Sequence, residues 1–241
     1  MNAATPPNTA IYAVGDIHGR HDLLGAMNQR ILEDARQRQA TSRQIVYLGD
    51  YVSRGIDSRR VVDMVLAPPY AGFSKICLKG NHEDLLLRFL AGDFDAGRHW
   101  FDHDGLGTLA HYGVTIRDTD ARNDSNMALL REQFAAALPA PHLDFFCSLQ
   151  VSHHAGGYYF VHAGIRPGVP LPRQSAADCM WMREPFLSSD ADHGAVIVHG
   201  HSISEQVVLR SNRIGIDTAA YRTGTLTCLV LDGVTRTVLQ T

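Results

Sequence analysis

The chain has 241 residues, of which 45% are hydrophobic, and this is enough to bury a substantial core in a single domain spanning residues 1–241. The formal net charge is −3 and the charged residues are interspersed, which argues against a surface for nucleic acid. Residues 1–9 have neither a basic start nor an apolar run, and no stretch approaches membrane-spanning length. We therefore expect a cytoplasmic, monomeric protein without a nucleic-acid or membrane partner.

The first third of the chain alternates short apolar runs with helical periodicity. Strands are predicted at 11–14, 45–48 and 76–78, and apolar residues at helical spacing predict helices over 23–31, 61–66 and 85–90. The predicted order is therefore βαβαβα with short connections.

The strand signal is lost between residues 92 and 150, where a helix-like pattern covers 127–138. We expect this helical or loop segment to cover the functional site. Further strands are then predicted at 158–161, 195–198, 213–216, 225–231 and 235–239, the last two joined by a tight turn at Asp232-Gly233. The chain is expected to have an α/β fold.

The four cysteines are widely spaced and form no Cys-x-x-Cys pair, which argues against a zinc knuckle and against a redox motif. We expect Cys77, Cys147, Cys179 and Cys228 to be thiols of the core.

Polar residues able to bind metal follow five of the predicted strands. These segments are Gly15-Asp16-Ile17-His18-Gly19, Gly49-Asp50, Gly80-Asn81-His82-Glu83, His162-Ala163-Gly164 and His199-Gly200-His201. Each segment alone is more often a helix cap, a turn or an ordinary histidine. Together they are expected to meet at the carboxyl edge of the sheet. Two aspartates, an asparagine and three histidines exceed the needs of one ion, so the sequence predicts two divalent metals, Mn²⁺, Fe or Zn²⁺, with a bridging carboxylate.

The motifs GDIHG, GDYVSRG, GNHE, HAG and HGH resemble those of the phosphoprotein phosphatase branch of the calcineurin-like metallophosphoesterases. The segment WMRE at 181–184 is similar to one in lambda-type serine/threonine phosphatases, and GIDTAAYRTGTLTCL resembles the C-terminal strands of those enzymes and of bacterial diadenosine tetraphosphatases. The resemblance implies a sandwich of two mixed β-sheets flanked by helices.

The resemblance also implies a ligand set. Asp16, His18 and Asp50 would hold the first metal. The second would be held by Asp50, Asn81, His162 and His201, with Asp50 as the bridge and Mn²⁺ as the expected ion. His199 lies on the opposite phase of its strand and is expected to be structural.

The catalytic groups implied by the resemblance are two arginines and a histidine. Arg54 and Arg183 would bind the phosphoryl oxygens, together with Asn81, because the planar guanidinium can grip two oxygens at once. His82 would be the general acid for the leaving oxygen, and a hydroxide held by the two metals would attack phosphorus in line. Arg222 stands where several relatives carry an aromatic residue, and its role is open.

Ser53 departs from the family pattern, in which an aspartate at this position pairs with the acid histidine. A serine could orient the ring of His82 but could not supply the negative charge. The expected function is a serine/threonine-phosphatase-like phosphomonoesterase. A dinucleoside polyphosphate hydrolase is the alternative favoured by Ser53, because bacterial diadenosine tetraphosphatases also lack that aspartate. A binding module that has lost the chemistry is the third reading.

Overall fold

The computed structural model describes residues 3–67, 70–115 and 123–241. Its first sheet has the strand order β10-β9-β1-β2-β3. The bounds are β1 (Thr9–Val14), β2 (Ser42–Tyr47), β3 (Phe73–Cys77), β9 (Thr227–Asp232) and β10 (Thr235–Gln240). The strands β1, β2 and β3 are parallel, so their carboxyl ends lie at one edge. The predicted C-terminal hairpin is confirmed, because β9 and β10 pair antiparallel from Asp232 and Thr235 onward.

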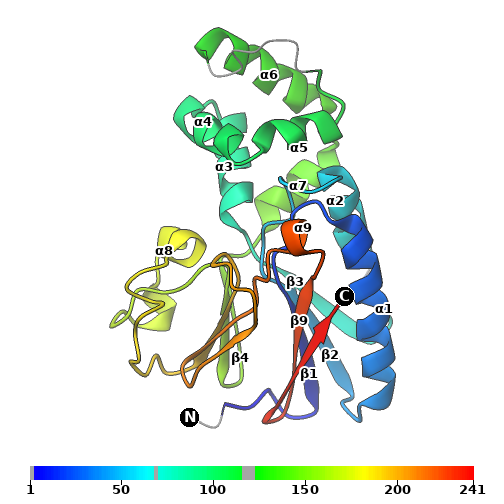
Figure 1. The fold of residues 1–241 in the computed structure, drawn as a ribbon, viewed down its shortest axis with the longest axis vertical. Helices are drawn as coiled ribbons and strands as arrows, with labels where there is room; N and C mark the ends of the chain where they lie inside the picture. The colour runs from blue at the N-terminus through cyan, green and yellow to red at the C-terminus, as the bar shows by residue number, and fades with distance from the viewer. Residues whose placement is uncertain (1–2, 68–69, 116–122) are drawn as a thin grey trace.

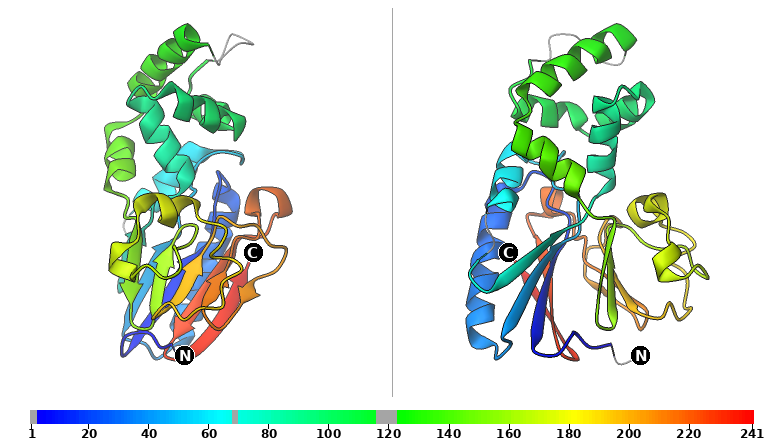
Figure 2. Two further views of the ribbon diagram at one scale, coloured as in Figure 1. Left: turned by 90° about the vertical axis from the view of Figure 1, so that its left-hand side faces the viewer. Right: turned by 180° about the vertical axis from the view of Figure 1, so that it is seen from behind.

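The second sheet has the order β4-β5-β6-β8-β7 and packs against the first (Figure 1, Figure 2). Its strands are β4 (Ser152–Ala155), β5 (Tyr158–Val161), β6 (Val196–His199), β7 (Val208–Leu209) and β8 (Arg213–Gly215). The inner faces share one apolar cluster in which Ile11 and Leu229 of the first sheet join Phe160 and Ile214 of the second. This confirms the predicted sandwich of two mixed sheets.

Helices α1 (His21–Gln37) and α2 (Ser58–Leu66) cover the outer face of the first sheet. They follow β1 and β2 in the chain, and α1 buries Leu24, Met27 and Ile31 at helical spacing against that face. The predicted strand and helix order of the first third is therefore confirmed.

A helical region stands above the strand ends in Figure 1. It begins with α3 (Asn81–Leu90) and continues with α4 (Phe94–Asp102), α5 (Gly105–His111), α6 (Asp124–Ala137) and α7 (Ala140–Ser148). We call α4 to α7 the cap. Its aromatic core includes Trp100, Phe101 and Phe134, which lie near Phe89 of α3 or near one another. The predicted helix at 127–138 corresponds to α6, whereas α4, α5 and α7 had no distinct signal in the sequence.

Two shorter elements, a 3₁₀ turn (Leu171–Arg173) and α8 (Ala176–Trp181), lie on the side of the second sheet. The short helix α9 (Ala220–Thr223) precedes β9, and its Ala220 joins the same apolar cluster as α1. The expectation of core thiols is wrong for Cys147, which is exposed because α7 turns Phe145 and Phe146 inward instead. Cys179 and Cys228 are buried and Cys77 is half-buried. Among the described residues, none of the helices is both long and apolar enough to cross a bilayer.

Candidate metal centre

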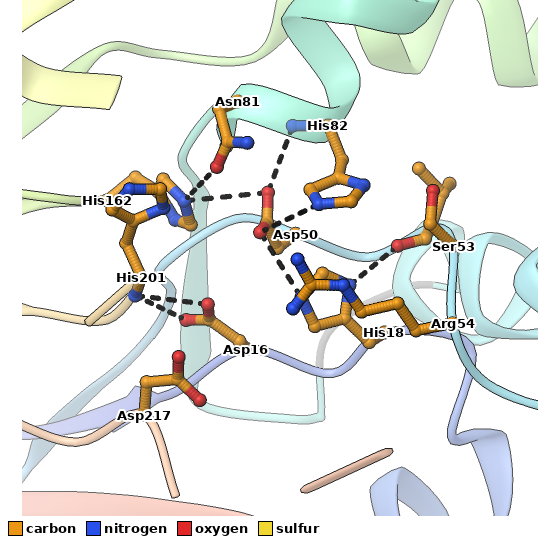
Figure 3. Close-up of polar contacts among 12 residues, drawn as sticks. Asp16, His18, Asp50, Ser53, Arg54, Asn81, His82, His162, His201 and Asp217 are labelled. Atoms are coloured by element: carbon orange, nitrogen blue, oxygen red, sulfur yellow. Dashed lines mark hydrogen bonds and ion pairs between the residues drawn. The ribbon is translucent and has the colours of Figure 1, made fainter. Parts of the chain in front are cut away.

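The predicted site residues meet at the carboxyl ends of strands from both sheets (Figure 3). Asp16 and His18 follow β1, and Asp50 follows β2. Asn81 and His82 begin α3 directly after β3, and His162 and His201 follow β5 and β6 of the second sheet. The junction of the two sheets therefore gathers all the predicted metal ligands.

Two of the histidines are fixed in one ring orientation by backbone carbonyls. His18 Nδ1 lies 2.8 Å from the carbonyl oxygen of Val52, and His162 Nδ1 lies 2.9 Å from that of Leu48. Each Nδ1 must carry the proton of this hydrogen bond, so each neutral ring turns an unprotonated Nε2 toward the centre. A backbone carbonyl on one ring nitrogen is the usual support of a metal-binding histidine.

The Asp50 carboxylate lies between two groups of possible ligand atoms. One group consists of His18, Asp50 and His82, and the other of Asp50, His162 and His201, and within each group the atoms lie within 4.8 Å of one another. The Asp50 oxygens are 3.3 Å from His18 Nε2 and 3.5 Å from His162 Nε2. Asp50 is thus placed where a bridging ligand would have to be.

Some of these contacts join two acceptors with no proton between them. His162 Nε2 faces Asn81 Oδ1 at 2.9 Å, although the proton of this ring is already on Nδ1. Burial lowers the pKa of His162 to about 4 and that of His18 to about 3, so a second proton does not resolve the contact. A cation bound between the two acceptors would satisfy both. The donor set therefore fits divalent metal ions.

Glu83 holds the segment that carries Asp50. Its buried carboxylate accepts the backbone N–H groups of Asp50 (2.9 Å), Tyr51 (2.9 Å) and Gly80 (3.0 Å). Glu83 therefore stabilises the start of its own helix and also clamps the neighbouring ligand loop. Burial, and then the charge of Asp50, raise the pKa of Glu83 to about 7.

Two glycines allow the carboxylates to approach the backbone. A Cβ at Gly80 would lie 2.1 Å from Asp50 Oδ1, and a Cβ at Gly200 would lie 1.9 Å from Asp16 Oδ1. Asp50 Oδ1 instead accepts the N–H of His82 (3.1 Å) in the first turn of α3, where an anion is favoured. Close passage of the backbone explains the glycines that flank the ligands.

Asp16 differs from the other predicted ligands, because its carboxylate accepts the N–H of His201 at 3.0 Å and lies outside both groups of possible ligands. The place that the sequence assigned to Asp16 in the first group is taken by His82. Beside Asp16 lies the buried Asp217, which the sequence reasoning missed. Burial and then the charge of Asp217 raise the pKa of Asp16. Asp217 follows β8, the same type of position that revealed the other ligands.

The predicted phosphate-binding arginines both reach this centre. The guanidinium of Arg54 lies 5.0 Å from the ring centre of Tyr221, and Figure 3 shows it extending toward Asp50 and His18. No described carboxylate is within ion-pair distance of its guanidinium. Arg183 Nε lies 3.3 Å from His201 Nε2. Both arginines therefore reach the centre, Arg54 from a half-buried position and Arg183 from an exposed one. Arg222 is exposed as well.

Rings from the cap and from α8 line the rim of the site. The ring of His82 lies 6.2 Å from that of His103, His103 lies 4.8 Å from His99, and His99 lies 5.6 Å from Trp181. Trp181 in turn lies 6.3 Å from His201. The contact between His99 and Trp181 joins α4 of the cap to α8 across the site.

The expectation that Ser53 orients His82 is wrong. The Ser53 hydroxyl accepts the indole N–H of Trp100 at 3.0 Å and lies 3.4 Å from Thr108 Oγ1. The buried ring nitrogens of His82 have no hydrogen-bond partner among the described residues. Asp57 is not a substitute carboxylate, because it caps α2 by accepting the N–H of Arg60. His199 is buried, with Nδ1 at 3.0 Å from the carbonyl oxygen of Gly200.

Several solved structures are similar to this chain. Among solved structures, a candidate diadenosine tetraphosphatase is 20% identical, with a TM-score of 0.65 and coverage of 99% of this chain and 98% of the other. A cold-active protein-tyrosine phosphatase of a psychrophilic Shewanella species is 16% identical, with a TM-score of 0.50 and coverage of 98% and 83%. A protein serine/threonine phosphatase from Saccharomyces cerevisiae is 14% identical, with a TM-score of 0.48 and coverage of 97% and 80%.

The family assignment comes from a match to a whole-domain model. The calcineurin-like phosphoesterase model matches residues 9–223, which contain every predicted ligand and both predicted phosphate-binding arginines. Because the matched residues make up most of the chain, the protein belongs to the calcineurin-like phosphoesterase family and is a phosphoester hydrolase of that family.

Proposed function

We propose that the protein hydrolyses phosphate monoesters with the help of two divalent ions, of which Mn²⁺ is the expected one and Fe or Zn²⁺ are the alternatives. Asp16, His18 and Asp50 would hold the first ion. The second would be held by Asp50, Asn81, His162 and His201. When bound, such a pair of ions polarises the phosphoryl group and lowers the pKa of bound water, which supplies the nucleophile at neutral pH.

The observation that carries this proposal is the position of the Asp50 carboxylate between two groups of imidazole nitrogens. Nδ1 of His18 and Nδ1 of His162 are both occupied by backbone carbonyls, so the Nε2 atoms that face Asp50 are free to bind a cation. The buried carboxyls have raised pKa values, with Asp50 at about 7, and a nearby cation would favour their charged form.

The chain's own residues bind and orient the phosphoryl group. Arg54 and Arg183 approach the centre from different segments, and each guanidinium can donate two parallel hydrogen bonds to phosphoryl oxygens. The amide of Asn81 would contact a further oxygen. These contacts strengthen as negative charge spreads over the equatorial oxygens in the transition state.

His82 is the proposed proton donor to the leaving oxygen. Its ring is fully buried between His18 and the rim residue His103. The nearest carboxylate oxygen, on Asp50, is 3.9 Å away and is expected to be engaged by the ions. Burial, and then the nearby His18 and Arg54, hold the pKa of His82 well below its ordinary value. We therefore expect the enzyme to prefer substrates whose leaving groups need little protonation.

Hydrolysis of a dinucleoside polyphosphate is the second candidate, because nucleoside phosphates are good leaving groups and His82 lacks a partner carboxylate. The structure most similar in TM-score among those described above is that of a candidate diadenosine tetraphosphatase. The two candidates differ in their products: inorganic phosphate from phosphoserine or phosphotyrosine peptides, and nucleotides from diadenosine tetraphosphate.

The proposed function is tested by measuring hydrolysis of p-nitrophenyl phosphate after chelation and after addition of Mn²⁺. We expect chelation to abolish activity and Mn²⁺ to restore it. Asp50→Asn should be nearly inactive, because it weakens the ligand shared by both ions. Wild-type turnover in chelator, or most of it in Asp50→Asn, would contradict the proposal. Turnover of a panel of substrates under the same conditions then shows whether the enzyme prefers phosphate monoesters or dinucleoside polyphosphates.

A further inference from the structure

The loop that carries Arg54 has an unfavourable backbone conformation. Ser53 and Arg54 are consecutive residues with φ values of 70° and 68°, although neither is glycine. The left-handed region is disfavoured for residues with a side chain, because Cβ comes too close to the following carbonyl oxygen. A pair of such residues persists only where the surroundings hold it in place.

The cap supplies three hydrogen bonds to this pair. Thr108 Oγ1 of α5 accepts the N–H of Ser53 at 3.0 Å, and Trp100 Nε1 of α4 donates to Ser53 Oγ at 3.0 Å. The Asp104 carboxylate, at the start of α5, accepts the N–H of Arg54 at 2.7 Å. Ser53, Trp100 and Thr108 have no exposed surface, so water cannot replace the two partners of Ser53. The N–H of Ser53 is shared with Ser58 Oγ, which is also 3.0 Å away.

The opposite side of the loop packs on the candidate ligands. A Cβ at Gly55 would lie 1.9 Å from the carbonyl oxygen of His18, and the carbonyl of Val52 fixes the ring of His18. The loop is therefore held between the cap and the segment that carries His18. The side chain of Arg54 passes over Tyr221 toward the centre.

We propose that Thr108, Asp104 and Trp100 of the cap are positioning residues for Arg54, which they hold in the orientation that binds phosphate. This proposal rests on the proposed function of Arg54. It also assigns a role to Ser53, whose backbone N–H and hydroxyl form hydrogen bonds with the cap. In the family, the aspartate at this position instead pairs with the acid histidine. The cap is then part of the phosphate-binding machinery as well as a cover of the site.

The test compares Thr108→Val with Thr108→Ser in the Mn²⁺-loaded protein. Valine has a similar shape but no acceptor, so it leaves the buried N–H of Ser53 with one partner fewer, whereas serine keeps the hydroxyl. We expect inorganic phosphate to bind about tenfold more weakly to Thr108→Val, roughly the effect of one disrupted buried hydrogen bond. Thr108→Ser should bind phosphate like the wild type. Binding is measured by calorimetry and as competitive inhibition, with bound metal counted in each variant.

A double-mutant cycle shows whether Thr108 acts through Arg54. If it does, Thr108→Val weakens phosphate binding in the wild type but has no further effect in Arg54→Ala. The matched control is Thr5→Val, which also removes a hydroxyl with two hydrogen bonds, to Thr9 and Gly233, at the other end of the sheet. This control should lower stability without changing phosphate affinity.

Substitution of Asp104 gives a second test of the proposal without changing the core, because the side chain of Asp104 is exposed. Asp104→Ala should weaken phosphate binding, and Asp104→Asn, which keeps an acceptor oxygen, should largely restore it. The proposal is overturned if Thr108→Val and Asp104→Ala bind phosphate like the wild type, or if their effects persist unchanged in Arg54→Ala. A wild-type protein that neither binds phosphate nor hydrolyses esters would refute the proposed function itself.

Discussion

At the scale of single residues, several candidate ligands have an unfavourable backbone conformation. His18, Asp50 and His201 have φ values of 45°, 52° and 59°, so three predicted ligands are in the left-handed region. Such conformations are held by the surrounding structure, here by the Glu83 carboxylate in the case of Asp50. Nothing in the local sequence pattern predicts them, because the compensating contacts come from residues distant in the chain.

Two assignments at this scale needed the structure. Asp217 was missed because it follows a short strand, β8, without the Gly-Asp pattern that drew attention to Asp16 and Asp50. Ser53 was interpreted as a partner of His82 because the aspartate at the same position in the family pairs with the acid histidine. The hydrogen bond from Trp100, a residue of the weakly predicted segment, could not be anticipated without the position of the cap.

A first prediction separates the roles of Asp16 and His82. His82, and not Asp16, is grouped with His18 and Asp50, yet we assign the metal to Asp16 and proton transfer to His82. Asp16→Asn should therefore lose about one of two bound ions, because an amide is a much weaker ligand than a carboxylate. His82→Asn should keep both ions and slow phosphoserine hydrolysis much more than p-nitrophenyl phosphate hydrolysis.

The measurements for this prediction are metal content after equilibrium dialysis and turnover of both substrates. If His82→Asn loses an ion while Asp16→Asn retains two, the two roles are exchanged and His82 is a ligand.

At the scale of elements, helix α3 links the sheet to the cap and carries the site at its first turn. Gly80 is the N-cap residue, and the side chain of Glu83 returns to the Gly80 N–H. The sequence predicted a helix over 85–90, because apolar residues at helical spacing are a local signal, and in the structure this helix begins earlier, at Asn81. The cap helices that follow are seven to fourteen residues long, too short for periodicity to identify all of them.

A second prediction uses two glycines in different elements. Gly80→Ala should fold but bind Mn²⁺ at least tenfold more weakly, because the added methyl group would sit 2.1 Å from Asp50 Oδ1. Gly25→Ala, within α1, should instead stabilise the protein by about 0.5–1 kcal/mol, since its Cβ would approach only the flexible Met64, at 3.8 Å. Metal titration and thermal unfolding measure both. Unchanged metal affinity in Gly80→Ala would contradict the tight packing described for Asp50.

At the scale of the whole molecule, the site exists only because two sheets meet at their carboxyl edges. Asp16, His18 and Asp50 come from the first sheet, while His162 and His201 come from the second. The strand pattern predicted an α/β fold with further strands in the second half of the chain, and the family resemblance implied their arrangement as a sandwich of two sheets. The resulting concentration of buried carboxyls carries an electrostatic cost, because Asp16, Asp50, Glu83 and Asp217 all have raised pKa values.

The last prediction follows from that cost. Burial raises the folded-state pKa of Asp50 and of Glu83 to about 7, above the ordinary value of about 4 for a carboxyl group in an unfolded chain. Without metal, these two carboxyls bind more protons in the folded protein than in the unfolded chain, so they make stability fall as pH rises from about 4 to 7. Buried histidines with lowered pKa values, such as His18 and His162, act in the opposite direction below their ordinary pKa of about 6.5. Bound cations favour the ionised carboxylates and remove this penalty. The stabilisation by Mn²⁺, measured as the difference between the unfolding temperatures with the ion and in chelator, should therefore grow from pH 5 to pH 7, at roughly 2–4 °C per kcal/mol for a chain of this size. The folded-state pKa values of His18 and His162 are already below this interval, so among these groups it is the carboxyls that must lose protons to bind the ions. Calorimetric scans at pH 5, 6, 7 and 8 with and without Mn²⁺ measure this. If the difference between the unfolding temperatures with and without Mn²⁺ narrowed as pH rises, the buried carboxyls would already be ionised without metal.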